Sequence, residues 1–404
     1  MFPYIVRQGD TVLRIAREFG VNTESLLAAN PRLSAAIKLI PGLLLLVPDQ
    51  LASMYCIQKG DTLLRISEAF NVPVTGLTAA NPHLDLKQLV PGQMIKIPLG
   101  ARSRIVEGGA EYGHAELKRD LEALEHEYPF LQKAVIGYSV LNKPISAVRL
   151  GDGPRKLQIN AAMHANEWIT TPLLMFFMED LAKACACGGS FGGVDMRRLM
   201  QQVSVWFVPL VNPDGVELVQ EGLQRDHSYY NQLQLWNRHS SHFAKWKANV
   251  RGVDLNDQFP AFWEEEVKRR GTAGPGPRDY PGTAPLSEPE AQALFSFTQE
   301  QGFDMVLALH TQGQEIYWNY RGYEPQHAEA LALKLALASS YKPVKLSGSD
   351  AGFKDWFIQD FRKPGFTVEV GLGVNPLPIA SFPDLYDELW PLLVTAIEAL
   401  AEEA

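Results

Sequence analysis

The sequence has few cysteines, no excess of positive charge and no long apolar run. Three cysteines in 404 residues cannot build a disulfide framework. A formal net charge of −9, with both signs interspersed, gives no support for nucleic-acid binding. No run approaches the roughly 20 apolar residues that cross a bilayer. The N-terminus, MFPYIVRQGDTVLRIAREFG, carries charges where a signal peptide has an apolar segment, so we expect no export signal.

The composition is that of an ordinary globular protein of more than one domain. Apolar residues make up 46% and charged residues 21% of the chain. A length of 404 residues exceeds the usual size of a single domain. Internal repeats and changes of pattern along the chain therefore indicate where its domains lie.

The first hundred residues contain a repeat. The segment Tyr4–Leu33 (YIVRQGDTVLRIAREFGVNTESLLAANPRL) recurs at Tyr55–Leu84 (YCIQKGDTLLRISEAFNVPVTGLTAANPHL), an offset of 51 residues. Each copy predicts a strand that ends in Gly-Asp-Thr, where Asp or Thr caps the following helix. A second short helix then leads to Ala-Asn-Pro, and a Pro-Gly turn precedes a closing strand.

This β-α-α-β unit resembles the LysM module over its whole length. The resemblance implies binding to N-acetylglucosamine-containing glycans such as peptidoglycan, in a groove between the Gly-Asp-Thr loop and the loop after the second helix. We place the modules at residues 3–48 and 54–98 and a glycine-containing linker at 99–110. A folding or dimerisation role is the alternative, but two tandem copies favour glycan binding, because weak sites gain avidity together.

Helical and strand patterns alternate from residue 111 to residue 404, which predicts an α/β sandwich around a mixed, mostly parallel sheet. Short apolar runs typical of strands covered on both faces occupy 156–165, 203–212, 304–312 and 365–373. Helical patterns occupy 112–129, 171–186, 288–301, 327–339 and 385–402. In such sheets, ligand-binding and catalytic residues lie at the carboxyl ends of the strands.

Three polar residues follow two of these strands. His164 and Glu167 come after the run LQINAAM, and His310 closes the run MVLAL. Catalytic zinc takes three nitrogen or oxygen ligands and leaves a fourth position for water. Two imidazoles and one carboxylate supply such a set, although His-x-x-Glu alone also occurs as strand-end polar residues bonded to local backbone.

Five ordered motifs resemble the zinc metallocarboxypeptidases: HANEW (164–168), VNPDGVE (211–217), WKANVRGVDLN (246–256), LALHTQG (307–313) and TVEVG (367–371). The resemblance spans residues 111–404 and implies a carboxypeptidase-like α/β/α sandwich. It also implies one zinc ion bound by His164, Glu167 and His310, with Glu369 as the catalytic glutamate. Lys247 follows Trp246 where the family carries its oxyanion-binding arginine; Arg251 is the rival, because a lysine lacks the planar fork of a guanidinium.

One motif departs from the family pattern. Carboxypeptidases use an Asn-Arg pair to bind the free C-terminal carboxylate, and this chain has Asn256-Asp257. The reversed charge repels a carboxylate, so an ordinary peptide C-terminus is disfavoured. The chain instead resembles the γ-D-glutamyl-meso-diaminopimelate peptidases, whose members can carry two N-terminal LysM modules. That resemblance implies hydrolysis of the γ-D-glutamyl bond in muropeptides.

Diaminopimelate has an ammonium and a carboxylate at its side-chain end. We expect Asp257 to pair with the ammonium and Lys354, in GSDAGFKDWF, to pair with the carboxylate. The alternatives are a helix cap for Asp257 and a solvated surface charge for Lys354. A tyrosine that family members carry is replaced by Ser347 on ungapped counting, with Tyr341 several residues earlier.

Two other functions stay open. One is an L,D- or D,L-carboxypeptidase or a deacylase of amino-acid derivatives. The other is a glycan-binding protein with a decayed peptidase domain, which the intact His164, Glu167, His310 and Glu369 set argues against. Without an evident export signal, we expect a cytoplasmic or sporulating-cell location with action at the cell wall.

Overall fold

A computed structural model describes residues 2–6, 10–12, 14–15, 26–27, 29–30, 33, 39–47, 52–57, 61–69, 74, 77–78, 81, 89–90, 92–98, 104–187 and 190–402. The chain forms two compact units, one of Met1–Ile105 with Asp180–Arg198 and one of Val106–Glu179 with Leu199–Ala404. Among the helices described, none is both long enough and apolar enough to cross a membrane. The domain boundaries expected from the sequence stay predictions.

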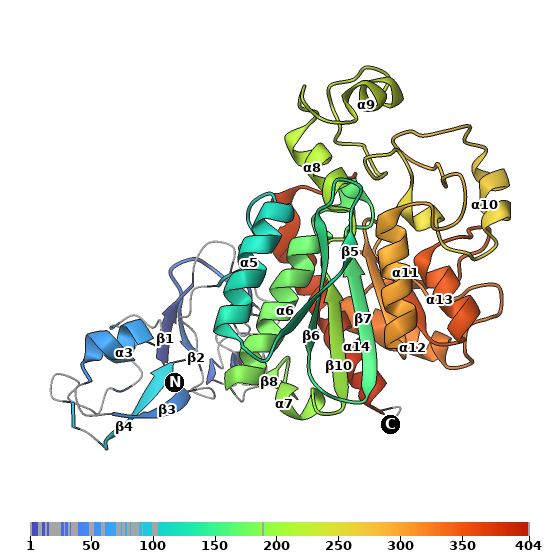
Figure 1. Cartoon of the computed structure of the whole chain (residues 1–404). Coiled ribbons are helices and arrows are strands. Elements are labelled where there is room, and N and C mark those ends of the chain that lie inside the picture. The colour runs from blue at the N-terminus through green and yellow to red at the C-terminus, as the bar shows by residue number, and fades with distance from the viewer. Residues whose placement is uncertain are drawn as a thin grey trace. The chain divides into compact units, whose positions relative to one another are not determined.

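Each N-terminal repeat forms a two-stranded antiparallel sheet. Strand β1 (Phe2–Ile5) pairs with β2 (Leu44–Val47), and β3 (Ala52–Cys56) pairs with β4 (Met94–Pro98). Helix α3 (Leu63–Ala69) follows β3 (Figure 1). The hydroxyls of Thr11 and Thr62 accept the backbone N–H groups of Arg14 (3.1 Å) and Arg65 (3.2 Å). Threonine therefore caps the first helix of each repeat, as predicted.

The asparagine of the first Ala-Asn-Pro motif has a structural task. Asn30 donates through Nδ2 to the carbonyl of Leu26 (2.8 Å) and accepts the backbone N–H of Leu46 (2.7 Å). It thereby ties the closing strand β2 to the preceding turn. The expected glycan groove involves Gly9 and Gly60, and these glycines lie outside the described residues.

The large unit is built on an eight-stranded mixed sheet. Its strand order is β13 (Lys342–Val344), β12 (Glu315–Tyr317), β14 (Gly365–Glu369), β11 (Met305–His310), β7 (Arg155–Ala161), β10 (Val203–Val208), β6 (Pro144–Leu150) and β5 (Gln132–Tyr138). Four of the seven neighbouring pairs are parallel. The sheet is therefore mixed and mostly parallel, as predicted.

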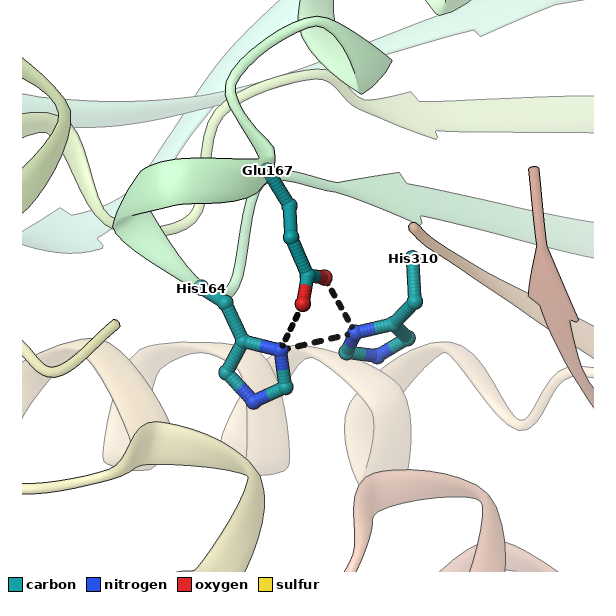
Figure 2. A group of neighbouring side chains, drawn as sticks. All are labelled: His164, Glu167 and His310. Atoms are coloured by element: carbon teal, nitrogen blue, oxygen red, sulfur yellow. Dashed lines mark hydrogen bonds and ion pairs between the residues drawn. The ribbon is translucent and has the colours of Figure 1, made fainter. Parts of the chain in front are cut away.

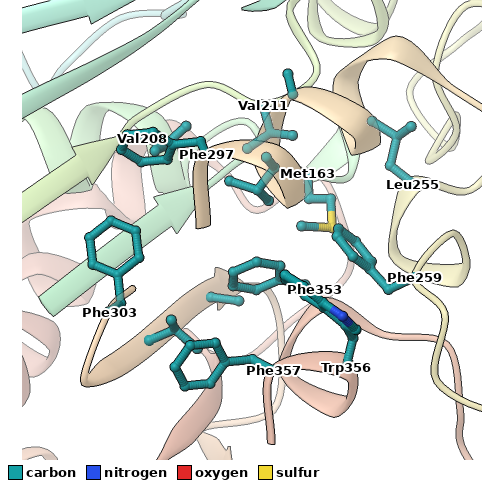
Figure 3. Packing of buried hydrophobic residues seen from close by; sticks show 14 of the residues in the cluster. Met163, Val208, Val211, Leu255, Phe259, Phe297, Phe303, Phe353, Trp356 and Phe357 are labelled. Atoms are coloured by element: carbon teal, nitrogen blue, oxygen red, sulfur yellow. The ribbon is translucent and has the colours of Figure 1, made fainter. Parts of the chain in front are cut away.

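Helices cover both faces of this sheet (Figure 1). Helices α11 (Pro289–Gln301) and α13 (Phe353–Phe361) pack on one face. The cluster between them and the strands contains Met163, Val208, Val211, Leu255, Phe259, Phe297, Phe303, Phe353, Trp356 and Phe357 (Figure 3). Helix α14 (Phe382–Glu402) contacts β7 and β10, and α12 (Ala328–Ser339) packs against α14.

The remaining elements include the long, mostly buried helix α6 and several shorter ones. They are α5 (His114–Glu127), α6 (Thr170–Cys187), β8 (Ser190–Phe191), β9 (Val194–Asp195), α7 (Met196–Leu199), α8 (Pro213–Glu221), α9 (Tyr230–Trp236) and α10 (Trp263–Arg270), with 3-10 turns η2 (Ala165–Glu167), η3 (Leu255–Asp257) and η4 (Ile379–Ser381). All five helices predicted for this region are present with ends that differ slightly. The sequence did not reveal β5, β6, β12, β13 or α13.

Candidate metal centre and active site

The three predicted metal ligands come together at the carboxyl ends of two neighbouring parallel strands. β7 ends just before His164, and the tight turn η2 brings Glu167 back to the same side. His310 is the last residue of β11, which pairs with β7. The exposed fraction is 4% for His164, 4% for Glu167 and 2% for His310. The strand ends therefore deliver the ligands to one buried point.

The ligand atoms converge closely enough to hold one ion (Figure 2). Nδ1 of His164 lies 3.0 Å from Oε1 of Glu167, and Nδ1 of His310 lies 2.8 Å from Oε2. The two Nδ1 atoms are 3.0 Å apart. Zinc–nitrogen bonds of about 2.0–2.1 Å in a tetrahedral site place two ligand nitrogens roughly 3.3 Å apart. Two imidazoles and a carboxylate in this arrangement therefore fit zinc.

Asp254 orients one of the ligands, and the sequence reading did not single it out. Its Oδ1 lies 3.1 Å from Nε2 of His164, and the carboxylate is fully buried. A carboxylate on the second ring nitrogen directs the first toward the metal and makes it more basic. Burial would lower the pKa of His164, but Glu167 and Asp254 outweigh burial and raise it to about 9. Asp254 stands two residues before Asn256 in the motif WKANVRGVDLN, but nothing in that motif indicates a contact with His164.

Glu369 is the last residue of β14 and stands in register with His310 on β11. Its side-chain carboxylate has no hydrogen-bond or ion-pair partner among the described residues. Burial raises its pKa to about 8, and Glu167 adds to the rise, while His164 and Lys247 oppose it. A carboxyl group with a raised pKa beside a metal site suits proton transfer near neutral pH. Its catalytic role stays a prediction.

Of the two candidate cations, Lys247 lies at the metal site. Its Nζ is 3.5 Å from Oδ2 of Asp254, and its carbonyl accepts the N–H of Ala165 in the ligand turn (3.0 Å). Burial would lower the pKa of Lys247, but Asp254 and Glu167 raise it, so the ammonium stays charged. Arg251 is held elsewhere, with Nε donating to the Tyr229 hydroxyl (3.3 Å). The geometry favours Lys247.

Asp257 does not offer the free carboxylate that the sequence suggested. Nη2 of Arg270 donates to its Oδ1 (2.7 Å), and Nε of Arg270 lies 2.7 Å from Oδ2. Only 2% of Asp257 is exposed. Asp254, not Asp257, caps the turn η3. The structure therefore disfavours the expected pairing of Asp257 with a substrate ammonium. Asn256 is half-buried and accepts the N–H of Phe353 (3.1 Å).

Lys354 is buried, so the alternative of a solvated surface charge is wrong. Its exposed fraction is 5%, and Nζ donates to the carbonyl of Asn319 (2.8 Å) and to the carboxylate of Asp355. A role for Lys354 in binding a substrate carboxylate stays a prediction.

Tyr341 is not available to cap a substrate. Its exposed fraction is 3%, and its hydroxyl donates to Glu388 (3.1 Å) and accepts the N–H of Gly371 (3.3 Å). Ser347, at the position given by ungapped counting, is exposed. The site therefore lacks the family's tyrosine at either of these positions.

A glutamate that the sequence reading missed lies next to Glu369. Strand β12 runs antiparallel to β14 and pairs Glu315 with Glu369 and Tyr317 with Thr367. The hydroxyl of Tyr317 donates to Oε2 of Glu315 (2.7 Å). The alternation Glu-Ile-Tyr was a signal, but three residues are too few to identify a strand with an inward face.

Comparisons with known proteins agree with this geometry. The zinc carboxypeptidase family model matches residues 117–370, and the LysM domain model matches 4–48 and 55–98. Gamma-D-glutamyl-L-diamino acid endopeptidase 1 from Lysinibacillus sphaericus is 46% identical over 70% of this chain and 72% of its own. The uncharacterized protein YqgT from Bacillus subtilis is 38% identical over 78% of this chain and 83% of its own. Bovine thrombin-activatable fibrinolysis inhibitor has a similar fold, with a TM-score of 0.57, 17% identity, and coverage of 74% of this chain and 99% of its own.

Proposed function

The chain belongs to the zinc carboxypeptidase family, and from this premise we propose that it cleaves the γ-D-glutamyl bond before a diamino acid in cell-wall peptides. One observation supports the proposal that the chain hydrolyses a peptide bond. The carboxylate of Glu369, which has no protein partner among the described residues, lies beside His310 of the three candidate metal ligands. The Lysinibacillus sphaericus relative, whose name states the γ-D-glutamyl-L-diamino acid bond, supports the substrate class. Meso-diaminopimelate is the diamino acid that the sequence predicts.

Each side chain of the site has a task in this proposal. His164, Glu167 and His310 hold a zinc ion, which lowers the pKa of water and polarises a carbonyl group when bound. Glu369 accepts the proton of the attacking water and delivers it to the leaving amine. The Lys247 ammonium, buried and charged, donates to the carbonyl oxygen as negative charge develops there.

The two LysM domains supply the second half of the proposal. We infer that they bind N-acetylglucosamine-containing glycan and keep the peptidase near peptides attached to it. Two weak sites on one chain raise the overall affinity for a polymer that displays the same unit repeatedly. Sedimentation of the full-length chain with insoluble peptidoglycan tests this part, with competition by soluble chito-oligosaccharide as the control.

A digest of the tetrapeptide L-Ala-γ-D-Glu-meso-diaminopimelate-D-Ala tests the proposed reaction. We expect L-Ala-D-Glu and the dipeptide diaminopimelate-D-Ala as products. Release of D-alanine alone would instead identify a carboxypeptidase. Glu369→Gln should abolish hydrolysis while one zinc per chain is retained, which separates catalysis from metal binding. Hydrolysis by this variant at the wild-type rate, or activity that survives full chelation, would contradict the proposal.

A further inference from the structure

The face of β14 that carries Glu369 continues onto β12. Directly opposed residues of antiparallel strands project to the same side, so Glu315 lies beside Glu369 and Tyr317 beside Thr367. Gly365 shares this face two residues before Thr367. A Cβ at Gly365 would lie 3.4 Å from Cγ of Lys354, which belongs to α13. The strand pair and α13 therefore face each other around these side chains.

Tyr317 holds the carboxylate of Glu315 in place. Its hydroxyl donates to Oε2 of Glu315 at 2.7 Å, and both residues are half-buried. Within the described part of the chain, Oε1 of Glu315 has no hydrogen-bond donor. A phenol that occupies one oxygen fixes the orientation of the group and leaves the other oxygen for a ligand.

Glu315 also differs from the other acids around the site in its electrostatic surroundings. Asp257 contacts Arg270, and Asp355 contacts Lys354. Glu315 has no cation within ion-pair distance among the residues that the structure describes. It stands instead beside a second carboxylate, Glu369. Two carboxylates side by side repel each other unless a positive charge is present.

We propose that Glu315, oriented by Tyr317, binds the side-chain ammonium of the diamino acid that follows the cleaved bond. This inference rests on the proposed function and explains why a diamino acid is required there. Glu369 acts on the scissile bond, and opposed residues on paired strands have Cβ atoms about 4.5–5.5 Å apart. A four-carbon stem spans roughly 6 Å, which is long enough to bring its ammonium to a carboxylate on the neighbouring strand. Glu315 thus takes the role that the sequence reading assigned to Asp257.

The test compares three substrates that differ only in the last residue: L-Ala-γ-D-Glu followed by L-lysine, Nε-acetyl-L-lysine or L-norleucine. With the full-length zinc enzyme, we expect kcat/KM to be highest for lysine. Glu315→Gln should lower kcat/KM for lysine by about 10- to 100-fold, as for a lost charge-assisted hydrogen bond. The norleucine value should stay within about twofold, since that substrate has no ammonium. Glu329→Gln, at an exposed position of α12, is the matched control and should change none of the values.

Tyr317→Phe provides a second variant that keeps the ring and removes only the hydroxyl. We expect a smaller loss for lysine, chiefly in KM, and no loss for norleucine. An equal loss on lysine and norleucine in Glu315→Gln would overturn the inference, and so would a wild-type enzyme that cleaves lysine and acetyl-lysine substrates equally well. If Glu315→Gln fails to fold, the wild-type comparison and Tyr317→Phe decide the question. A wild-type enzyme that cleaves the diaminopimelate tetrapeptide but not the lysine substrate would also overturn the inference, because both carry the side-chain ammonium. An enzyme that cleaves neither would refute the proposed function instead.

Discussion

Replacing Arg270 by methionine should destabilise the large unit more than replacing Asp257 by asparagine. The guanidinium contacts three carboxylates: Asp257 at 2.7 Å, Glu266 at 2.8 Å and Asp279 at 3.0 Å. The exposed fraction of the side chain is 20% for Arg270 and 3% for Asp257. Removing one partner of a buried pair costs about 3–5 kcal/mol, because the other charge is left uncompensated.

Asp257→Asn and Arg270→Met should differ in their cost to stability because each leaves different charged partners in place. Asp257→Asn leaves Arg270 with Glu266 and Asp279, so we expect a loss of about 1.5–3 kcal/mol, as for one hydrogen bond to a charged group. Arg270→Met leaves Asp257 buried without a cation and should cost about 3–5 kcal/mol. Arg269→Met, on the same helix, is the matched control. Arg269 is 41% exposed, and among the described residues Glu266 is its single ion-pair partner, so its loss should cost about 0–1 kcal/mol.

Acidic pH should reduce the loss in the free energy of unfolding that Arg270→Met causes. Burial, with a contribution from Asp254, raises the pKa of Asp257 to about 7 even with Arg270 present. A group whose pKa is higher in the folded than in the unfolded chain contributes stability at low pH and loses it as pH rises through the folded value. Arg270 lowers the pKa of Asp257, so in Arg270→Met that pKa rises further. The deficit should therefore be larger at about pH 8.5 than at about pH 5.5.

Urea unfolding followed by tryptophan fluorescence measures these differences. All eight tryptophans, from Trp168 to Trp390, belong to the large unit, so the signal does not report on the N-terminal repeats. Equal costs for Arg269→Met and Arg270→Met, or a cost below about 1 kcal/mol for Arg270→Met, would refute the reasoning. A second readout concerns specificity: Asp257→Asn should keep the preference for a lysine over a norleucine substrate.

Three further changes have expected outcomes. Asp254→Asn removes the carboxylate that orients a ligand ring and should weaken zinc binding about 10- to 100-fold, measured by competition with a chelator. Lys247→Ala should lower kcat about 10²- to 10³-fold with zinc retained, whereas Arg251→Ala should change kcat little. A larger fall in kcat for Arg251→Ala would assign the oxyanion contact to Arg251. Tyr341→Phe should lower the free energy of unfolding by about 1 kcal/mol without affecting kcat. A fall in kcat would instead place its hydroxyl at the substrate.

The sequence predicted the metal set because each ligand lies in a short motif, and the order of these motifs resembles that of the zinc metallocarboxypeptidases. His164 and Glu167 are three residues apart, and His310 closes a short apolar run that is typical of a buried strand. Strand ends in a parallel sheet meet at one edge, so the ligands were expected to converge. The five long helices were predicted because each shows its own apolar period.

Contacts between distant segments could not be read in this way. Asp254 meets His164 across 90 residues, and nothing in either motif states the pairing. Arg270, the last residue of α10, contacts Asp257 in the turn η3, and neither segment shows this contact in its sequence. Glu315 belongs to a three-residue strand, which is too short to show alternation. In each case the partner depends on the packing of elements, not on their local pattern.

The backbone ladder between β11 and β14 has a consequence for how this enzyme class diversifies. Since His310 and Glu369 stand in register on neighbouring parallel strands, the sheet fixes the lateral distance between their backbones at about 4.8 Å. Insertions or replacements in the surrounding loops change what enters the site but leave that spacing untouched. New specificities can therefore arise by substitution on the neighbouring strand β12, while the spacing of His310 and Glu369 stays the same.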